Sequence, residues 1–86
     1  METTFTFRNL EASDGLKTHA LAKLQKLKKY LIKPTTAHVI FNVERFHHQA
    51  EITLNANGIQ YVGHEKSEDM YISIDKAIAK LERQLK

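Results

Sequence analysis

Residues 36–65 read TAHVIFNVERFHHQAEITLNANGIQYVGHE, and this stretch decides the fold because apolar and polar residues alternate in three successive runs. A period of two is typical of half-buried strands, so we expect strands over 36–44, 49–56 and 59–65. Asn57-Gly58 separates the second run from the third, and this pair favours a two-residue hairpin turn. The stretch therefore predicts an antiparallel meander of three strands.

One face of this meander is apolar and should meet the core. In the first two strands its members are Ala37, Val39, Phe41, Val43, Ala50, Ile52, Leu54 and Ala56. The opposite face should be partly exposed to water, and it carries Ile40, Thr53, Gln60 and Val62.

Upstream, residues 3–8 alternate in the same way and predict a short strand with Phe5 and Phe7 on one face. A helix should follow from about 14 to about 32, with Ser13 as its N-cap. Its apolar stripe repeats every three or four residues, as expected for one buried face. The stripe consists of Leu16, Ala20, Leu24, Leu27 and Leu31, and Lys33-Pro34 should end the helix.

A second helix is predicted at the end of the chain. Ser67 is its expected N-cap, with Glu68 and Asp69 favourable at the positive end of the helix dipole. The apolar stripe consists of Met70, Ile74, Ala77, Ile78, Leu81 and Leu85.

The predicted order is thus β-α-β-β-β-α, an α+β fold in which residues 1–86 form a single domain. Two helices with one apolar face each should pack on one face of a four-stranded mixed sheet. A right-handed crossover makes the first two strands parallel.

The composition excludes several classes of protein. The chain has 86 residues, 42% hydrophobic residues, no cysteine and a formal net charge of +3. Without cysteine there is no disulfide scaffold, thiolate nucleophile or cysteine-based zinc site. No apolar run is long enough for a membrane span, and METTFTFRN lacks the apolar region of a secretory signal. We therefore expect a cytoplasmic protein that does not enter a membrane.

Positive charge is concentrated on the first predicted helix. Asp14 is its only acid, whereas its cations are Lys17, Lys23, Lys26, Lys28, Lys29 and Lys33. At 100° per residue from Leu16, one exposed side spans roughly 220–340° and is almost purely cationic. That side holds His19, Lys23, Lys26, Lys29, Tyr30 and Lys33, while Lys17 and Lys28 lie on the other flank.

The second predicted helix also sorts its charges, with its cations at roughly 220–280° and its acids at roughly 120–140° from Met70. The cations are Lys76, Lys80 and Arg83, and the acids are Asp75 and Glu82. We expect two adjoining basic ridges, the footprint of a surface that binds phosphate backbone.

A lysine-rich helix face is often no more than a solvated surface. A helix built for solubility, however, normally mixes signs in i, i+4 pairs, and like charges at that spacing destabilise a helix by a few tenths of a kcal/mol per pair. A bound polyanion would relieve this repulsion, and structured RNA read by helices fits better than single strands stacked on the sheet. Tyr30 and Tyr71 could stack on bases, although Tyr71 is expected at the border of the core.

No arrangement of residues indicates catalysis. His47-His48 are expected in the turn between two strands, where adjacent side chains seldom converge on one ion, and no HxxxH or HExxH spacing occurs. His38 and His64 lie on predicted strands, and His64 and Glu65 should point to opposite faces. We expect a binding module, not an enzyme, with no cofactor, metal site or small-molecule substrate.

The final run EDMYISIDKAIAKLERQLK (68–86) resembles the ribosome hibernation promoting factor and ribosome-associated inhibitor family, also described as sigma-54 modulation proteins. The basic helix LKTHALAKLQKLKKYLIKP (16–34), the AEITL strand and the Asn-Gly turn extend the resemblance over nearly the whole chain. It implies a β-α-β-β-β-α fold similar to double-stranded RNA-binding domains.

The resemblance also implies a function. Family members bind 16S rRNA of the small (30S) subunit in the channel shared by mRNA and the A- and P-site tRNAs. They silence translation under stress or in stationary phase and preserve idle ribosomes. The basic family positions match Lys17, Lys23, Lys26, Lys29, Lys80 and Arg83. Candidate further RNA contacts are His19, Lys28, Tyr30, Lys33, Lys76 and Lys86, of which Lys28 and Lys76 rest on the helical wheel alone.

The sequence ends at Lys86, directly after KLERQLK. The given sequence does not continue into an acidic tail like that of the inhibitor type. It also does not continue into the ribosome-pairing domain of long members. The chain therefore resembles the short type, which needs a second hibernation factor to pair ribosomes. A truncated long-type factor is the alternative.

Three alternative functions make different predictions. A general duplex-RNA module should bind naked duplexes as well as ribosomes. A modulator of sigma-54-dependent transcription should show salt-insensitive protein binding through an apolar patch that includes Ile40, Val62 and Ile72. A small acylphosphatase-like enzyme is disfavoured, because the final strand and the anion loop it needs are absent.

Overall fold

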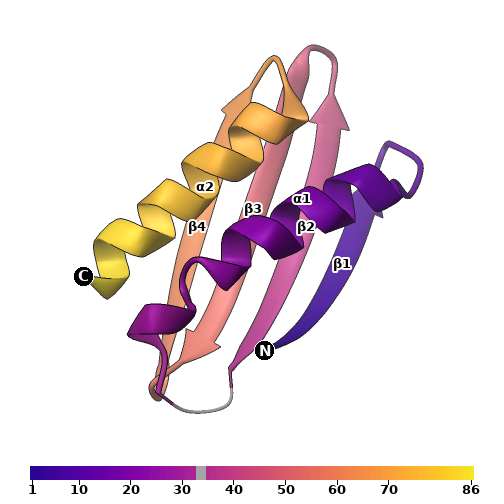
Figure 1. Ribbon diagram of the computed structural model, residues 1–86. Helices are drawn as coiled ribbons and strands as arrows, with labels where there is room; N and C mark the ends of the chain where they lie inside the picture. Colours follow the sequence, from indigo (N-terminus) through magenta and orange to yellow (C-terminus); the bar gives the residue numbers. More distant parts are fainter. Residues whose placement is uncertain (33–34) are drawn as a thin grey trace.

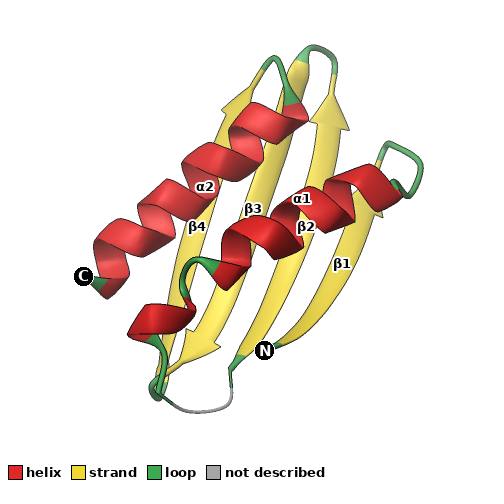
Figure 2. Cartoon of the chain, viewed as in Figure 1, coloured by secondary structure: helices red, strands yellow, loops and turns green. Residues whose placement is uncertain are grey.

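Four strands pair in chain order to form one sheet, and two helices cover one of its faces (Figures 1 and 2). The structure is a computed structural model that describes residues 1–32 and 35–86. Lys33 and Pro34, where the first helix was predicted to end, lie outside the described residues. The elements are β1 (Glu2–Arg8), α1 (Asp14–Gln25), the short 3₁₀ helix η1 (Lys28–Tyr30), β2 (Thr36–Glu44), β3 (His47–Ala56), β4 (Ile59–Ser67) and α2 (Met70–Leu85).

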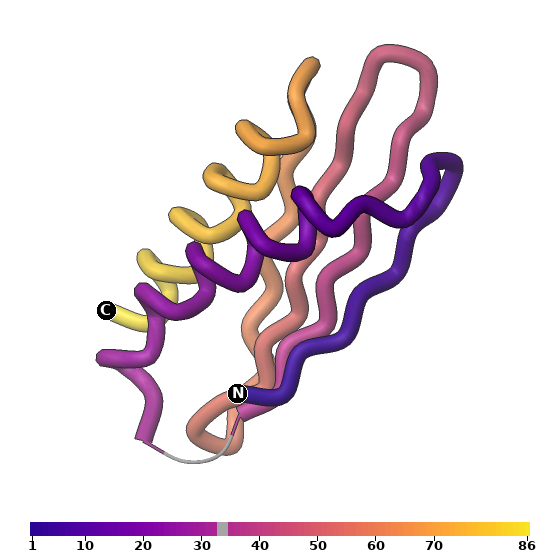
Figure 3. The backbone as a smooth tube through the Cα atoms, turned by 45° about the vertical axis from the view of Figure 1, so that its right-hand side comes forward, coloured from indigo at the N-terminus to yellow at the C-terminus, as the bar shows by residue number. Residues whose placement is uncertain are grey.

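The sheet is mixed, as predicted. β1 pairs with β2 in parallel, and β2, β3 and β4 pair antiparallel in that order. Both helices lie on the same side of the sheet, which the turned view makes clear (Figure 3). The predicted α+β fold with two helices on one face is therefore confirmed.

The first hairpin turn is not where we predicted it. His47 and His48 lie on β3, where they pair with Glu44 and Val43, so the turn consists of Arg45 and Phe46. A shift of register by one residue would move every apolar side chain to the wrong face of the sheet. Burial of the apolar side chains of β2 and β3 therefore fixes the pairing of these strands, which extends as far as His47 and His48 and leaves a turn of two residues. In this turn Arg45 has a φ of 55°.

The second hairpin follows its sequence signal. Asn57 and Gly58 have φ angles of 55° and 76°, the left-handed values that two-residue hairpin turns favour. Asn57 has a second role, because its side-chain amide donates to the Tyr30 carbonyl and accepts from the Ile32 N–H, both at 3.3 Å. This pair of bonds joins the turn to the end of η1.

The first helix is shorter than predicted. Ser13 caps it as expected, since its hydroxyl accepts the Leu16 N–H at 3.2 Å. At Lys26 and Leu27, however, the backbone N–H groups bond three residues back instead of four, at 3.1 and 3.0 Å. The prediction of one helix to about residue 32 is wrong because this tightening and the bonds from Asn57 replace the last α-helical turns.

The second helix begins later than predicted. Its N-cap is Asp69, which accepts the Tyr71 N–H at 2.8 Å, so the prediction of Ser67 as the cap is wrong. Ser67 ends β4, and its hydroxyl lies 2.6 Å from that of the buried Ser73, which donates to the His48 carbonyl. A buried hydroxyl needs such partners, and this network ties the start of α2 to the sheet.

The core fills the single layer between the helices and the sheet. β1 contributes Phe5 and Phe7, whose rings lie 6.1 and 4.9 Å from that of the fully buried Phe41. The other buried apolar residues are Leu16, Ala20, Leu24, Leu27, Ala37, Val39, Ala50, Ile52, Leu54, Ala56, Met70, Ile74, Ala77, Ile78 and Leu81. The opposite sheet face is open, and none of the described helices is long and apolar enough to cross a membrane.

Gly63 sets the distance between β4 and α2. A Cβ atom at this position would lie 2.5 Å from the Ala77 carbonyl oxygen and 3.1 Å from Leu81 Cγ. The nearest neighbour is backbone, which cannot rotate away as a side chain can.

We predict that Gly63→Ala destabilises the fold by about 1–3 kcal/mol, the range for overpacking in a well-filled core. Thermal unfolding followed by circular dichroism should show a fall in Tm of about 4–8 °C per kcal/mol. The matched control is Gly58→Ala, because nothing lies within 4 Å of the added Cβ and only the positive φ is strained. A loss no larger than in the control would contradict the steric role of Gly63.

Candidate nucleic-acid interface

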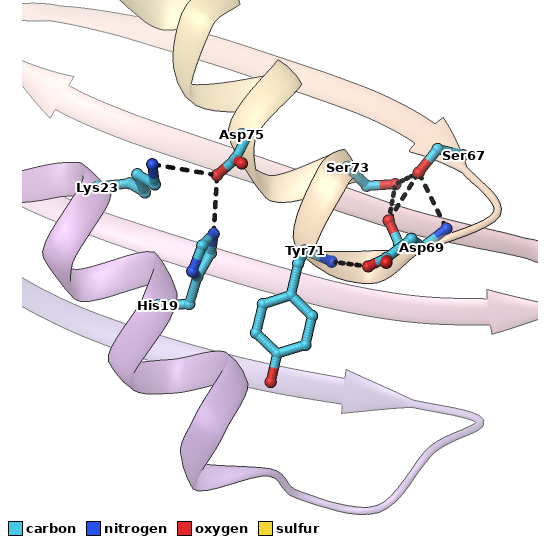
Figure 4. A network of polar contacts seen from close by, with 7 residues as sticks. All are labelled: His19, Lys23, Ser67, Asp69, Tyr71, Ser73 and Asp75. Atoms are coloured by element: carbon cyan, nitrogen blue, oxygen red, sulfur yellow. Dashed lines mark hydrogen bonds and ion pairs between the residues drawn. The ribbon is translucent and has the colours of Figure 1, made fainter.

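Acidic side chains of α2 occupy the seam between the two helices. Asp75 Oδ1 lies 2.8 Å from His19 Nε2 and 3.7 Å from Lys23 Nζ (Figure 4). Further along the seam, the Tyr30 hydroxyl donates to Glu82 at 3.2 Å. These polar contacts hold α1 and η1 against α2.

The cations of α2 face the other way, toward the sheet edge. Lys80 Nζ lies 3.0 Å from the Glu65 carboxylate on β4 and donates to the His64 carbonyl oxygen at 3.2 Å. Lys76 and Arg83 lie one turn to either side of Lys80, and their charges also act on Glu65. The expectation of adjoining basic ridges is therefore wrong, because Asp75 and Glu82 lie between the α2 cations and α1.

The helical wheel correctly separated the acids of α2 from its cations. It could not show that the acids face α1 and η1 or that Lys80 faces β4. That depends on how α2 lies across the sheet, where it packs mainly on β3 and β4.

The pKa of Glu65 is lowered from its ordinary value of 4.5. The hydrogen bond and ion pair with Lys80 are the main cause, and the positive charges of Lys76 and Arg83 add to it. Lys80 is therefore partly neutralised in the free protein.

The lysines of α1 and η1 do not form one ridge. Lys17 lies on the β1 flank, with its Nζ 5.9 Å from the ring centres of both Phe5 and Phe7. Lys23 points into the seam toward Asp75. The wheel no longer applies beyond Gln25, where α1 ends.

Exposed cations gather instead at one end of the molecule. η1 and the C-terminal end of α2 lie at the same end, opposite the start of both helices (Figure 1). We call the exposed set at this end the basic end, and it consists of Lys26, Lys28, Lys29, Arg83 and Lys86. Cations at helix C-termini also interact favourably with the helix dipole, so part of this pattern serves stability.

Tyr30 and Tyr71 differ in their availability. The half-buried Tyr30 packs against the core, with Lys29 Nζ 5.2 Å from its ring centre. Tyr71 is 43% exposed and meets the His19 ring edge to face at 5.0 Å. Of the two rings, Tyr71 presents the more accessible surface.

The strand histidines His38 and His64 have structural partners. His38 bonds to the hydroxyls of Thr4 and Thr6, and His64 lies 3.3 Å from the Gln49 side-chain oxygen. His64 and Glu65 point to opposite sides of β4, as predicted. Within residues 1–32 and 35–86, no three metal-ligating side chains come together.

Two sets of functional side chains were missed from the sequence. Asp75 and Glu82 were noted as acids but not as the groups that join the helices. Asn57 was read only as a turn residue. The signal for Asp75 and Glu82 was their position on one flank of the predicted helix. For Asn57 there was no local signal, because it contacts Ile32 and Tyr30, which lie 25 and 27 residues away in the sequence.

With this geometry established, comparison with known proteins identifies the family. The family model described as "Sigma 54 modulation protein / S30EA ribosomal protein" matches residues 3–86. This chain belongs to that family. The resemblance seen in the final run is thus confirmed.

Individual members of the family agree with this assignment. The chain is 34% identical over 85 residues to "Ribosome hibernation promoting factor" of Escherichia coli (strain K12), a match that covers 99% of this chain and 90% of that protein. The protein of the same name from Pseudomonas putida KT2440 is 34% identical over 86 residues, which covers 100% and 84%. The crystal structure of the Thermus thermophilus Protein Y N-terminal domain superposes with a TM-score of 0.93 at 29% identity, covering 99% and 96%.

The Glu65–Lys80 pair generates a pH prediction. Because the pKa of Glu65 is lower in the folded than in the unfolded chain, its stabilising contribution is complete above about 4.5 and is lost as the pH falls through the lowered value. Lys80→Met should raise the Glu65 pKa toward 4.5, as measured by NMR titration of the carboxyl carbon. Lys66→Met removes a cation from the same strand and should leave it unchanged. An unaltered pKa in Lys80→Met would refute the pairing.

Proposed function

We propose that this protein is a ribosome hibernation factor in which residues 1–86 act as a single ribosome-binding domain. Membership of the family and relatives named as hibernation promoting factors support this proposal. The observation that carries it beyond the family is the basic end, where five exposed cations gather from the end of α1, from η1 and from the C-terminal part of the chain.

The chemistry of the basic end fits ribosomal RNA. Lysine and arginine neutralise phosphates, and displacement of condensed counterions supplies a large share of the binding free energy. Arg83 can also bind a phosphate through two parallel hydrogen bonds. No bond is made or broken, so the protein acts by occupancy and not as an enzyme.

The proposed site is the channel of the 30S subunit shared by mRNA and the A- and P-site tRNAs. The domain extends 38 × 21 × 18 Å, and in that channel its folded body would exclude mRNA and tRNA sterically. Cytoplasmic ribosomes idle under stress or in stationary phase are the expected target, and pairing of two ribosomes would need a second hibernation factor.

The candidate contacts outside the basic end fall into three groups under this proposal. Lys23 and Lys80 would have to exchange Asp75 and Glu65 for phosphates, whereas Lys76 is exposed. Lys17 and His19 lie nearer the start of α1, so contacts by these two require RNA along the helix and not only at the basic end.

The structure disfavours the transcription alternative. Ile72 is exposed on α2, whereas Ile40 and Val62 lie on the open sheet face, on the far side of the sheet from the helices. These residues therefore cannot form the single apolar patch that this alternative requires.

The first test of the proposal neutralises the basic end. The triple variant Lys26→Gln, Lys29→Gln, Arg83→Gln should lose most co-sedimentation with 30S subunits. In a salt series the slope of log K against log salt should become shallower by about 0.7–0.9 for each phosphate that the variant no longer neutralises. Electrostatic binding predicts both effects.

The matched control removes three cations from the opposite end, as Arg8→Gln, Arg45→Gln, Lys66→Gln. Because both triple variants have the same net charge, unequal losses of binding report the position of the charges and not their sum. Equal losses would mean that only net charge matters and would overturn the proposed surface.

A competition experiment distinguishes ribosome binding from general duplex-RNA binding. A labelled chain bound to 30S subunits should resist displacement by an excess of naked duplex RNA, and bound mRNA and tRNA should block its binding. Displacement by the duplex at equal phosphate concentration would favour the general RNA-binding module.

A further inference from the structure

The end of the domain opposite the basic end is acidic. The ends of β1, β2 and β4 and the starts of both helices meet there (Figure 1). The described segments 8–14, 44–48 and 66–69 place five carboxylates at this end against three cations. The carboxylates belong to Glu11, Asp14, Glu44, Glu68 and Asp69, and the cations are Arg8, Arg45 and Lys66.

A shallow depression of about 400 Å³ lies at this acidic end, between the first turns of the two helices. Its apolar part comes from Leu10, Leu16, Met70 and Tyr71, and its polar part from Ser13, His48, Glu68 and Asp69. It combines an apolar floor with carboxylates at the rim.

Fold requirements explain only part of this lining. Leu16 and Met70 belong to the core, Ser13 and Asp69 cap the two helices, and the charge of Glu68 is favourable at the start of α2. Glu68 is exposed and makes no hydrogen bond or ion pair with the residues that the structure describes, while Tyr71 leaves 43% of its surface in water. A free carboxylate beside an accessible aromatic ring is a surface suited to a cationic partner.

We propose that this depression binds a basic arm of another RNA-binding protein, as an extended segment in which lysines and arginines flank one apolar side chain. The apolar side chain enters the depression between Leu10 and Tyr71, and the cations approach Glu68 and Asp69. Basic arms are common in proteins that bind nucleic acid, since they neutralise phosphate. This inference goes beyond the proposed RNA binding and uses the opposite end of the molecule.

Charge complementarity selects this occupant over RNA. A phosphate backbone at the depression would face two rim carboxylates, at an end where five acids outnumber three cations, so like-charge repulsion opposes it. A basic arm gains from these same charges. Because the pairs are solvent-exposed, each contributes little, so binding should be weak and sensitive to salt.

The test uses the intact chain labelled with ¹⁵N and a synthetic heptapeptide, acetyl-Lys-Arg-Lys-Leu-Lys-Arg-Lys-amide, as the probe. Amide signals of Ser13, His48, Glu68 and Tyr71 should shift together in NMR titrations. A peptide with glycine in place of leucine has the same charge and should bind several-fold more weakly, because it lacks the apolar side chain.

Two variants locate the site. Glu68→Gln should weaken binding by about two- to fivefold, the range for loss of one exposed charge pair. Glu2→Gln makes the same charge change at the basic end and should leave the affinity unchanged. The amide spectra also report whether each variant remains folded, so a loss of structure would not be mistaken for a loss of binding.

Three results would each overturn this proposal without affecting the ribosome-binding proposal. They are equal losses of affinity in Glu68→Gln and Glu2→Gln, equal affinity of the leucine and glycine peptides, and shifts of the same amides by an RNA hairpin but not by the peptide. Co-sedimentation of Glu68→Gln with 30S subunits should match that of the unaltered chain if the basic end alone binds RNA.

Discussion

Burial of one apolar sheet face beneath two helices is the constraint from which the rest of the structure follows. The sheet has a single covered face, and the apolar stripes of both described α-helices lie against it. α1 and α2 must therefore lie side by side on the same surface, and Gly63 allows α2 to approach the edge strand closely. Charged and polar side chains are therefore found in the seam between the helices, at the sheet edges and at the two ends of the molecule.

This arrangement separates charge along the molecule instead of across it. Asp75 and Glu82 are used to join the helices, and Glu65 neutralises part of the positive charge beside β4. The exposed cations of the basic end lie at Lys26, on η1 and at the C-terminal end of α2, while acids surround the starts of both helices. A domain with opposite charges at its ends is oriented by the field of a polyanion before it makes any contact.

The fold followed from local pattern to a large extent, because strand alternation, the Asn-Gly turn and the helical stripes each report burial directly. Errors arose where a distant residue overrides a local signal. Asn57 helps to end the first helix from the turn between β3 and β4. The antiparallel register that buries Phe41 opposite Ala50 places His47 and His48 on a strand. The charge of each helix face could be predicted from the sequence, but the element that each face packs against could not. The two predicted basic ridges are therefore not adjacent in the structure, because Asp75 and Glu82 lie between them.

Asn57 has a consequence for the lifetime of the molecule. An asparagine followed by glycine is chemically labile. The glycine backbone nitrogen attacks the side-chain carbonyl carbon, ammonia leaves, and water opens the resulting ring to give a carboxylate. That reaction would remove the donor to the Tyr30 carbonyl and place a negative charge beside the lysines of η1. Slow deamidation in the turn between β3 and β4 would then weaken the attachment of η1, the segment that presents part of the positive charge.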